Sequence, residues 1–490
     1  MLMHAPPRFP RSLAGLATCA LLLGAVGCDS PVATSAPVDD GLLALSEAPA
    51  PASNLDRLLR GLIIQQSGGA GLNAFILPQS NQLDRIPQDP QNPLTLQKVH
   101  LGKKLFHETA LGVNNLRPEG RETYACASCH AAIAGFNSGH PQGIAEGGSG
   151  FGVAGEGRRF LPEYNSDPIA PDALDRRPPA NVNTAYQEVV LWNGQFGAVG
   201  PNAGTEARWT PGTPLESNLL GFHGLETQAH AGLAVHRMAT PENSRVATIP
   251  EYKLMFQTAF PGDPSPVNRL NVALAIAAFE RTMLSNKAPW QLWLRGQLDA
   301  LTDQEKRGAV LFFNKANCVS CHAGPALNSM SFHALGMNDL DGTHRPDLID
   351  MRPFGGSMPE ASRQGRGGFT GVDEDYFKFK TPQIYNVADN TFLGHGASFQ
   401  NAREVIEYKN AALAQNPFVP ADRLSPLFVP LGLTAPEIDA LVAFVEGALY
   451  DPDLFRFVPE TLPSGNCTPM NDPQARMDLG CDDASLVVED

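Results

Sequence analysis

Residues 126–130 read Cys-Ala-Ser-Cys-His, and residues 318–322 read Cys-Val-Ser-Cys-His. Each stretch places two thiols and an imidazole on one helical turn, the arrangement that covalent attachment of a c-type haem requires. A zinc site or a redox dithiol is the alternative, but the cysteine pairs are much farther apart than those of a zinc ribbon, and a histidine follows both. The sequence therefore predicts two covalently bound haem c groups, on Cys126 and Cys129 and on Cys318 and Cys321, with His130 and His322 as iron ligands.

Helix signals dominate the rest of the folded part. Thr302 with Glu305, and Thr434 with Glu437, have the spacing of a capping box, which satisfies free backbone N–H groups at a helix start. Residues 137–225 are instead rich in Gly, Pro and Asn, which predicts long ordered loops. The expected fold class is mainly α, with two haem domains, long connecting loops and little β structure.

The N-terminal residues have the pattern of an export signal. Residues 1–27 combine a positively charged start with an apolar run that is too short to span a membrane, which predicts a signal peptide. Cys28 would then carry lipid, or be incidental if ordinary signal peptidase cleaves the chain. Residues 28–53, rich in Pro, Ala, Ser and Asp, read as a lipidated flexible linker. We therefore expect a periplasmic lipoprotein that meets the membrane only through this anchor.

The folded part is expected to contain an N-terminal haem domain over residues 54–285 and a C-terminal haem domain over residues 286–450. Residues 451–490 form a tail, in which an oxidising compartment favours a disulfide between Cys467 and Cys481.

Charge excludes one class of partner. The chain has 490 residues, with 51 acidic and 36 basic side chains and a net charge of -15. This surplus repels nucleic acid and would steer a cationic soluble protein toward the surface. It does not choose among such proteins.

Several ordered blocks around the two motifs resemble the bacterial di-haem cytochrome c peroxidase family, which includes the MauG enzymes. The resemblance runs from about Asn92 to Glu446 and implies two cytochrome c-like domains. The blocks are Asn92-Pro-Leu-Thr, Leu101-Gly-Lys-Lys-Leu-Phe, Leu191-Trp-Asn-Gly, Ala277-Ala-Phe-Glu-Arg-Thr, Leu301-Thr-Asp-Gln-Glu-Lys-Arg-Gly, Phe379-Lys-Thr-Pro and Gly394-His-Gly-Ala-Ser-Phe.

The resemblance implies a division of labour between the haems. The N-terminal haem would react with hydrogen peroxide, and the C-terminal haem would relay electrons from a small cytochrome c or a copper protein. His130 and His322 would be the proximal ligands. The family has a Trp between its haems, so Trp192 is the candidate electron bridge. Dimers are usual in the family, so a homodimer is possible here.

The resemblance also assigns the acid–base group. The family carries Glu in a Val-Glu-Met segment, and this chain has Val235-His-Arg-Met, so His236 occupies that place. An imidazole there could take a proton from one peroxide oxygen and return it to the other. Family members that need reductive activation have a His in the loop after the first motif. His140 lies too close to the motif to match it, so we expect a haem that is open on its distal side.

The sixth ligand of the C-terminal haem is left open by the residues themselves. Four methionines follow the second motif, and spacing favours none of them: Met330, Met337, Met351 and Met358. Family members use Met, or Tyr in MauG, at a fixed distance after the residue that matches His395. Counting forward leads to Lys409, with Tyr408 just before it, so Tyr408 is the preferred ligand and Lys409 or a displaced Met the alternative.

A calcium ion often lies between the domains in this family. Arg177 stands here where the family has an Asn ligand, and its charge could replace that of the ion, so calcium is possible but not favoured. Asn390 is the nearest remaining candidate ligand.

Three functions follow from these observations. The first is an oxidoreductase that reduces hydrogen peroxide. The second is a MauG-like enzyme that uses high-valent haem to oxidise Trp or Tyr of a partner protein. The third is an electron-carrier cytochrome without catalysis, which would need both irons to be six-coordinate.

Overall fold

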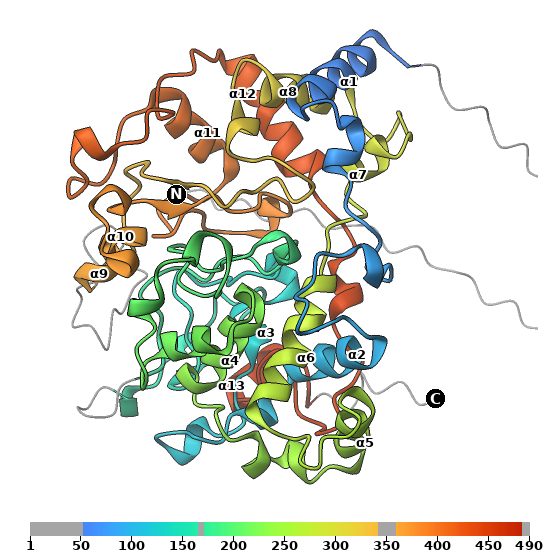
Figure 1. Cartoon of the computed structure of the whole chain (residues 1–490), viewed down its shortest axis with the longest axis vertical. Coiled ribbons are helices and arrows are strands. Elements are labelled where there is room, and N and C mark those ends of the chain that lie inside the picture. Colours follow the sequence, from blue (N-terminus) through green and yellow to red (C-terminus); the bar gives the residue numbers. More distant parts are fainter. Residues whose placement is uncertain (1–51, 165–170, 342–358, 483–490) are drawn as a thin grey trace, which may run out of the picture. The chain divides into compact units, whose positions relative to one another are not determined.

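The computed structural model describes residues 52–164, 171–341 and 359–482 (Figure 1). The predicted signal peptide and nearly all of the predicted linker, with Cys28, lie outside these residues, as do Met351 and Met358. No helix in the described ranges is long and apolar enough to cross a membrane.

Regular structure in these ranges is mainly helical, as the sequence predicts. The strands form two short antiparallel pairs, β1 (Gly148–Ser149) with β2 (Arg159–Phe160) and β3 (Phe332–His333) with β4 (Phe379–Lys380). The α-helices are α1 (Asn54–Gln66), α2 (Leu96–His107), α3 (Cys126–Cys129), α4 (Gly224–Val235), α5 (Pro250–Ala259), α6 (Arg269–Thr282), α7 (Pro289–Leu294), α8 (Asp303–Phe313), α9 (Glu360–Arg363), α10 (Gly365–Thr370), α11 (Ala402–Ala411), α12 (Ala435–Val442) and α13 (Pro473–Asp478).

Both predicted capping boxes are confirmed. Thr302 caps α8 together with Glu305, and Thr434 caps α12 together with Glu437. A π-helical turn, Ala443–Ala448, continues directly from α12. The prediction of long loops is also confirmed, since the described residues between α3 and α4 contain no α-helix.

The same helix crossing occurs twice. Helix α2 packs on α6 so closely that a Cβ added at Gly102 would lie 1.8 Å from the carbonyl oxygen of Ala275. Helix α8 packs on α12 in the same way, and a Cβ at Gly308 would lie 1.9 Å from the carbonyl oxygen of Ala440. Only glycine allows two helix backbones to approach this closely. Each haem motif follows the first helix of one such pair, so the chain contains two related halves.

Each half has its own apolar core, and the chain ends are exchanged between them. Leu59 and Ile63 of α1 are buried in the core that contains α8 and α12, and α1 lies beside α8 (Figure 1). Leu454 and Phe457, which follow the C-terminal half in sequence, are buried in the core that contains α2 and α6. Near both ends of the chain, the residues of each core therefore depart from the predicted domain boundary at residue 285.

The C-terminal tail is anchored to the N-terminal half. Cys467 and Cys481 form a disulfide. The buried carboxylate of Asp472 forms an ion pair with Arg158 at 2.7 Å and caps α13. Met470 packs on Phe151. The loop that carries Phe151 and Arg158 is thus held by residues far along the chain.

Candidate haem sites

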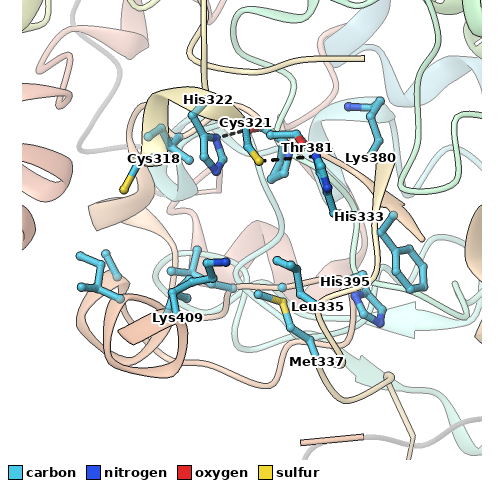
Figure 2. A pocket seen from close by; sticks show the side chains of 18 of the residues that line it. Cys318, Cys321, His322, His333, Leu335, Met337, Lys380, Thr381, His395 and Lys409 are labelled. Carbon is cyan, nitrogen blue, oxygen red and sulfur yellow. Dashed lines mark hydrogen bonds between the residues drawn. The ribbon is translucent and has the colours of Figure 1, made fainter. Parts of the chain in front are cut away.

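The second Cys-x-x-Cys-His motif opens onto a cavity of about 510 Å³. Cys318, Cys321 and His322 line it, and most of the remaining lining is apolar. Figure 2 shows His322 on one side of the cavity, with Leu335, Met337 and Lys409 on the opposite side. A flat ring bound through the two thiols would lie between these two sides.

Backbone carbonyls orient both motif histidines. His322 Nδ1 lies 3.1 Å from the carbonyl oxygens of Leu327 and Pro382, and His130 Nδ1 lies 3.4 Å from that of Phe136. A proton on Nδ1 that is donated to a carbonyl leaves the Nε2 lone pair free to bind a metal. Both rings are thus held in the tautomer that an axial ligand needs.

Burial keeps both imidazoles neutral. It lowers the pKa of His130 to about 4 and that of His322 to about 4, against the opposing effect of the carbonyl hydrogen bonds. Only a neutral imidazole can bind iron, so neither ring has to lose a proton near neutral pH before it can coordinate.

The first motif opens onto a smaller cavity, of about 60 Å³, lined by Cys126, Cys129 and His130. Helix α4 contributes Gln228, and His236 lies directly after its last residue. The structure therefore brings the predicted acid–base residue and the predicted proximal ligand to one cavity. His140 does not line it, and its Nδ1 lies 2.9 Å from the carbonyl oxygen of Gln142.

Asp172 holds His236 in place. Its Oδ2 lies 2.9 Å from Nδ1 of His236, and the carboxylate is largely buried. Burial disfavours the imidazolium, but the charge and hydrogen bond of Asp172 outweigh it and raise the pKa of His236 above its usual value. The ring also follows the C-terminus of α4, where the helix dipole favours a cation. Asp172 could not be predicted as the partner of His236, because it lies far from His236 in the sequence, in a loop without a periodic pattern.

A carboxyl group other than that of Asp172 lines this cavity. Glu280 of α6 is buried, and burial raises its pKa to about 8, so it is mostly protonated at neutral pH. Asn181 donates a hydrogen bond of 2.8 Å to Oε1, while Oε2 has no partner among the described residues. Sequence reasoning matched the block containing Glu280 but did not assign it a role.

Trp192 lines the cavity of the second motif, at its border with the N-terminal half. Its Nε1 donates a 2.7 Å hydrogen bond to the carbonyl oxygen of Arg177, and its ring centroid lies 6.2 Å from that of His395. His395 lines the cavity, where its ring stacks on Phe379 and its Nε2 contacts Asp339. The Trp ring is thus fixed beside one haem site.

Tyr408 and Lys409 point to different surroundings. The hydroxyl of Tyr408 donates a 2.5 Å hydrogen bond to the carbonyl oxygen of Leu335, and its ring packs between Phe399 and Phe428. Tyr408 is not among the residues that line the cavity, whereas Lys409 and Met337 are. Tyr408 would have to break this hydrogen bond to reach the iron.

The Arg177 guanidinium occupies the place considered for calcium. It donates hydrogen bonds to the carbonyl oxygens of Ser138, at 2.7 Å, and His140, at 3.0 Å, and to Oδ1 of Asn390, at 3.2 Å. Oxygens of this kind suit a calcium ion, but here they surround a cationic side chain. The side-chain oxygen of Asn390, the remaining candidate calcium ligand, therefore already accepts a hydrogen bond from Arg177.

The residues at both motifs fit a haem better than a metal ion alone. In the described ranges, no three His, Cys, Asp or Glu side chains converge as a protein-only metal site would need. The four motif cysteines are free thiols beside the two cavities. Two thiols for the porphyrin edge and one imidazole for the iron are the donor set of a c-type site.

Two related helical halves, each with a Cys-x-x-Cys-His motif beside a cavity, define the class of di-haem c-type cytochromes. Residues 96–299 match the family described as di-haem cytochrome c peroxidase. Over these residues the chain is a member of the di-haem cytochrome c peroxidase and MauG family, and it is an oxidoreductase of the cytochrome-c peroxidase type.

Named relatives span most of the chain. Cytochrome-c peroxidase IdrP1 of Denitromonas iodatirespirans is 28% identical over 78% of this chain and 88% of its own length. The methylamine utilization protein MauG of Methylorubrum extorquens is 26% identical over 75% of this chain and 83% of its own.

A solved structure shows the same fold. The crystal structure of a MauG-like protein associated with microbial copper homeostasis covers 77% of this chain and 95% of its own, with a TM-score of 0.51 and 23% identity.

Proposed function

We propose that this chain reduces hydrogen peroxide at a haem on Cys126, Cys129 and His130, with electrons passed from a haem on Cys318, Cys321 and His322. The observation that carries the proposal is the imidazole of His236, which Asp172 orients and which lines the same cavity as His130. One peroxide, two electrons and two protons would yield two water molecules. Each bound haem supplies the iron that binds peroxide or exchanges electrons.

His236 would move the proton. Because Nδ1 contacts Asp172, Nε2 is the atom that can take a proton from one peroxide oxygen and return it to the oxygen that leaves as water. Asp172 stabilises the imidazolium that exists between these two transfers. His236 and Asp172 thus provide acid–base chemistry at the cavity that His130 lines.

Trp192 would carry electrons between the halves. It lines the second cavity, and its Nε1 is bonded to the backbone of a residue from the N-terminal half. We expect a reduced small cytochrome c or a copper protein to supply the electrons. A cationic donor would be attracted by the net charge of -15, so salt should weaken the association.

The test compares the reaction of peroxide with wild-type protein and with His236→Ala, followed by the change in Soret absorption. Loss of an acid–base group lowers such rates by about 10²–10⁴-fold. His230→Ala is the matched control, because His230 lies on α4 but bonds to Ser217 and does not line the cavity. An unchanged rate in His236→Ala would remove His236 from the mechanism.

Covalent attachment and export are part of the proposal. Both haems should stay with the polypeptide after denaturation, and Cys→Ala changes at one motif should remove one haem only. Fractionation of cells should find the mature chain in the periplasm, bound to a membrane through lipid on Cys28. A cytoplasmic chain that retains residues 1–27 would contradict export.

The MauG-like activity is the second candidate, and the similarity to MauG of Methylorubrum extorquens favours it. In that case the oxidising equivalents from peroxide would be stored until a partner protein with an accessible Trp or Tyr removes them. Rapid discharge by a reduced cytochrome c favours the peroxidase. If the oxidised state instead persists in the presence of reduced cytochrome c and is discharged by a Trp- or Tyr-containing protein, the MauG-like activity is favoured.

A further inference from the structure

The large cavity has an unusual charge balance. Among the described residues that line it, five are cationic and none is a carboxylate. A haem cavity without acidic side chains leaves its positive charges to be balanced by the bound group. The five cations are Arg177, Lys315, Arg363, Lys380 and Lys409.

Two of these cations have an anionic partner elsewhere. Lys315 is half-exposed and pairs with Glu437 at 2.7 Å, and Arg363 pairs with Asp341 at 3.5 Å. Lys409 donates a hydrogen bond to the carbonyl oxygen of Leu427 and lies over an aromatic ring. Each of these three positive charges is therefore exposed or compensated by a neighbouring group.

Arg177 and Lys380 are different. Arg177 is 1% exposed and Lys380 is 6% exposed. Arg177 donates hydrogen bonds only to neutral oxygens and lies over the Phe392 ring, and its Nε has no partner among the described residues. In the same ranges, Nζ of Lys380 makes no hydrogen bond or ion pair. Burying an unpaired cation costs several kcal/mol, so an anion is expected to neutralise both.

The two cations occupy equivalent places in the two halves. Each precedes a proline by two positions, and Pro382 is the residue whose carbonyl orients His322. The backbone N–H of Arg177 donates to the carbonyl oxygen of His395 at 2.9 Å, and that of Lys380 donates to the carbonyl oxygen of Trp192 at 2.7 Å. Both cations are therefore fixed beside Trp192, at the edge of the cavity that faces the other half.

We propose that Arg177 and Lys380 bind the two propionate carboxylates of the haem at Cys318, Cys321 and His322. Two buried positive charges without counter-charge match the two carboxylates that a haem carries. The propionate edge of this haem then faces Trp192, which is the edge by which electrons would pass to the N-terminal half. The inference rests on the proposed haem occupancy but not on peroxide reduction.

The test is a redox titration of the purified di-haem protein, followed separately at each haem. A buried cation beside an iron disfavours its more positive oxidised state, so Lys380→Met should lower the midpoint potential of the C-terminal haem. Methionine fills similar space and leaves no buried charge, so the variant should fold. Lys315→Met is the matched control, because Lys315 lines the same cavity but already pairs with Glu437.

Resonance Raman spectra give a second measurement. The propionate bending bands of the C-terminal haem should shift in Lys380→Met and in Arg177→Gln, and remain in place in Lys315→Met. The proposal would be overturned by an unchanged midpoint potential in Lys380→Met together with unchanged propionate bands in both variants, or by a shift confined to the N-terminal haem. Neither measurement requires turnover, so a failed peroxidase assay would leave this result standing.

Discussion

The ionisation of His236 decides how the proposed reaction depends on pH. Its neutral form accepts the proton, and Asp172 raises the pKa above the usual value of 6.5. The neutral fraction, and with it the second-order rate with peroxide, should therefore fall as pH drops through that raised pKa. In Asp172→Asn the remaining effect of burial lowers the pKa, so the acidic limb should move to lower pH. Identical acidic limbs in stopped-flow pH profiles of the two proteins would contradict this role for Asp172.

The ligand of the second haem is also decided by single side chains. The Tyr408 hydroxyl is bonded to the Leu335 carbonyl, while Lys409 lines the cavity opposite His322 (Figure 2). We therefore expect Tyr408→Phe to leave the magnetic resonance spectrum of this haem unchanged and Lys409→Ala to alter it. A changed spectrum in Tyr408→Phe would instead support the ligand that the sequence favours.

At the level of elements, a buried ion pair attaches α1 to α8. Asp56 lies 2.9 Å from Nζ of Lys306 and accepts a 2.8 Å hydrogen bond from Trp293. Removing one partner of such a pair costs about 3–5 kcal/mol, because the other charge stays buried. We expect a loss of this size for Asp56→Ala in urea denaturation at pH 7.

The pH dependence of this pair has a definite sign. Burial opposes the Asp56 carboxylate, but its hydrogen bonds with Ser53, Trp293 and Lys306 prevail and lower its pKa well below the usual range. The stabilisation is therefore present above the unfolded pKa of about 4 and is lost as pH falls through the lower folded pKa. The difference between wild type and Asp56→Ala should shrink below that pH, and a constant difference would exclude the linkage.

The repeated helix crossing makes a second prediction for elements. A Cβ at Gly308 would overlap the Ala440 backbone, so Gly308→Ala should destabilise the chain by about 1–3 kcal/mol. Gly61, on an open face of α1, is the control, and alanine there should stabilise by up to about 1 kcal/mol. Equal effects in thermal denaturation would show that the crossing tolerates a wider spacing.

The elements were predictable where local signals are strong. The capping boxes of α8 and α12 and the loops after the first motif follow from neighbouring residues. The packing of α1 on α8 did not, because it joins segments far apart in sequence. The same limit explains why the partner of His236 and the unpaired charge of Lys380 were not predictable.

For the whole molecule, the two halves are related but have different cavities. The first contains His236 and Glu280 near His130, and the second contains Lys409 and Met337 opposite His322. The two motifs predict two haems and identify His130 and His322 as their ligands. The chemical difference between the sites depends on side chains that converge from distant loops, which spacing alone cannot show.

We expect the two haems to be unequal, with only the N-terminal one reacting with peroxide. The most direct measurement is low-temperature magnetic resonance and absorption spectroscopy of the diferric protein, before and after one equivalent of hydrogen peroxide. We expect a resting high-spin signal from the haem at His130, which peroxide removes in wild type and far more slowly in His236→Ala. Two low-spin haems that remain indifferent to peroxide, even after half-reduction, would contradict the account.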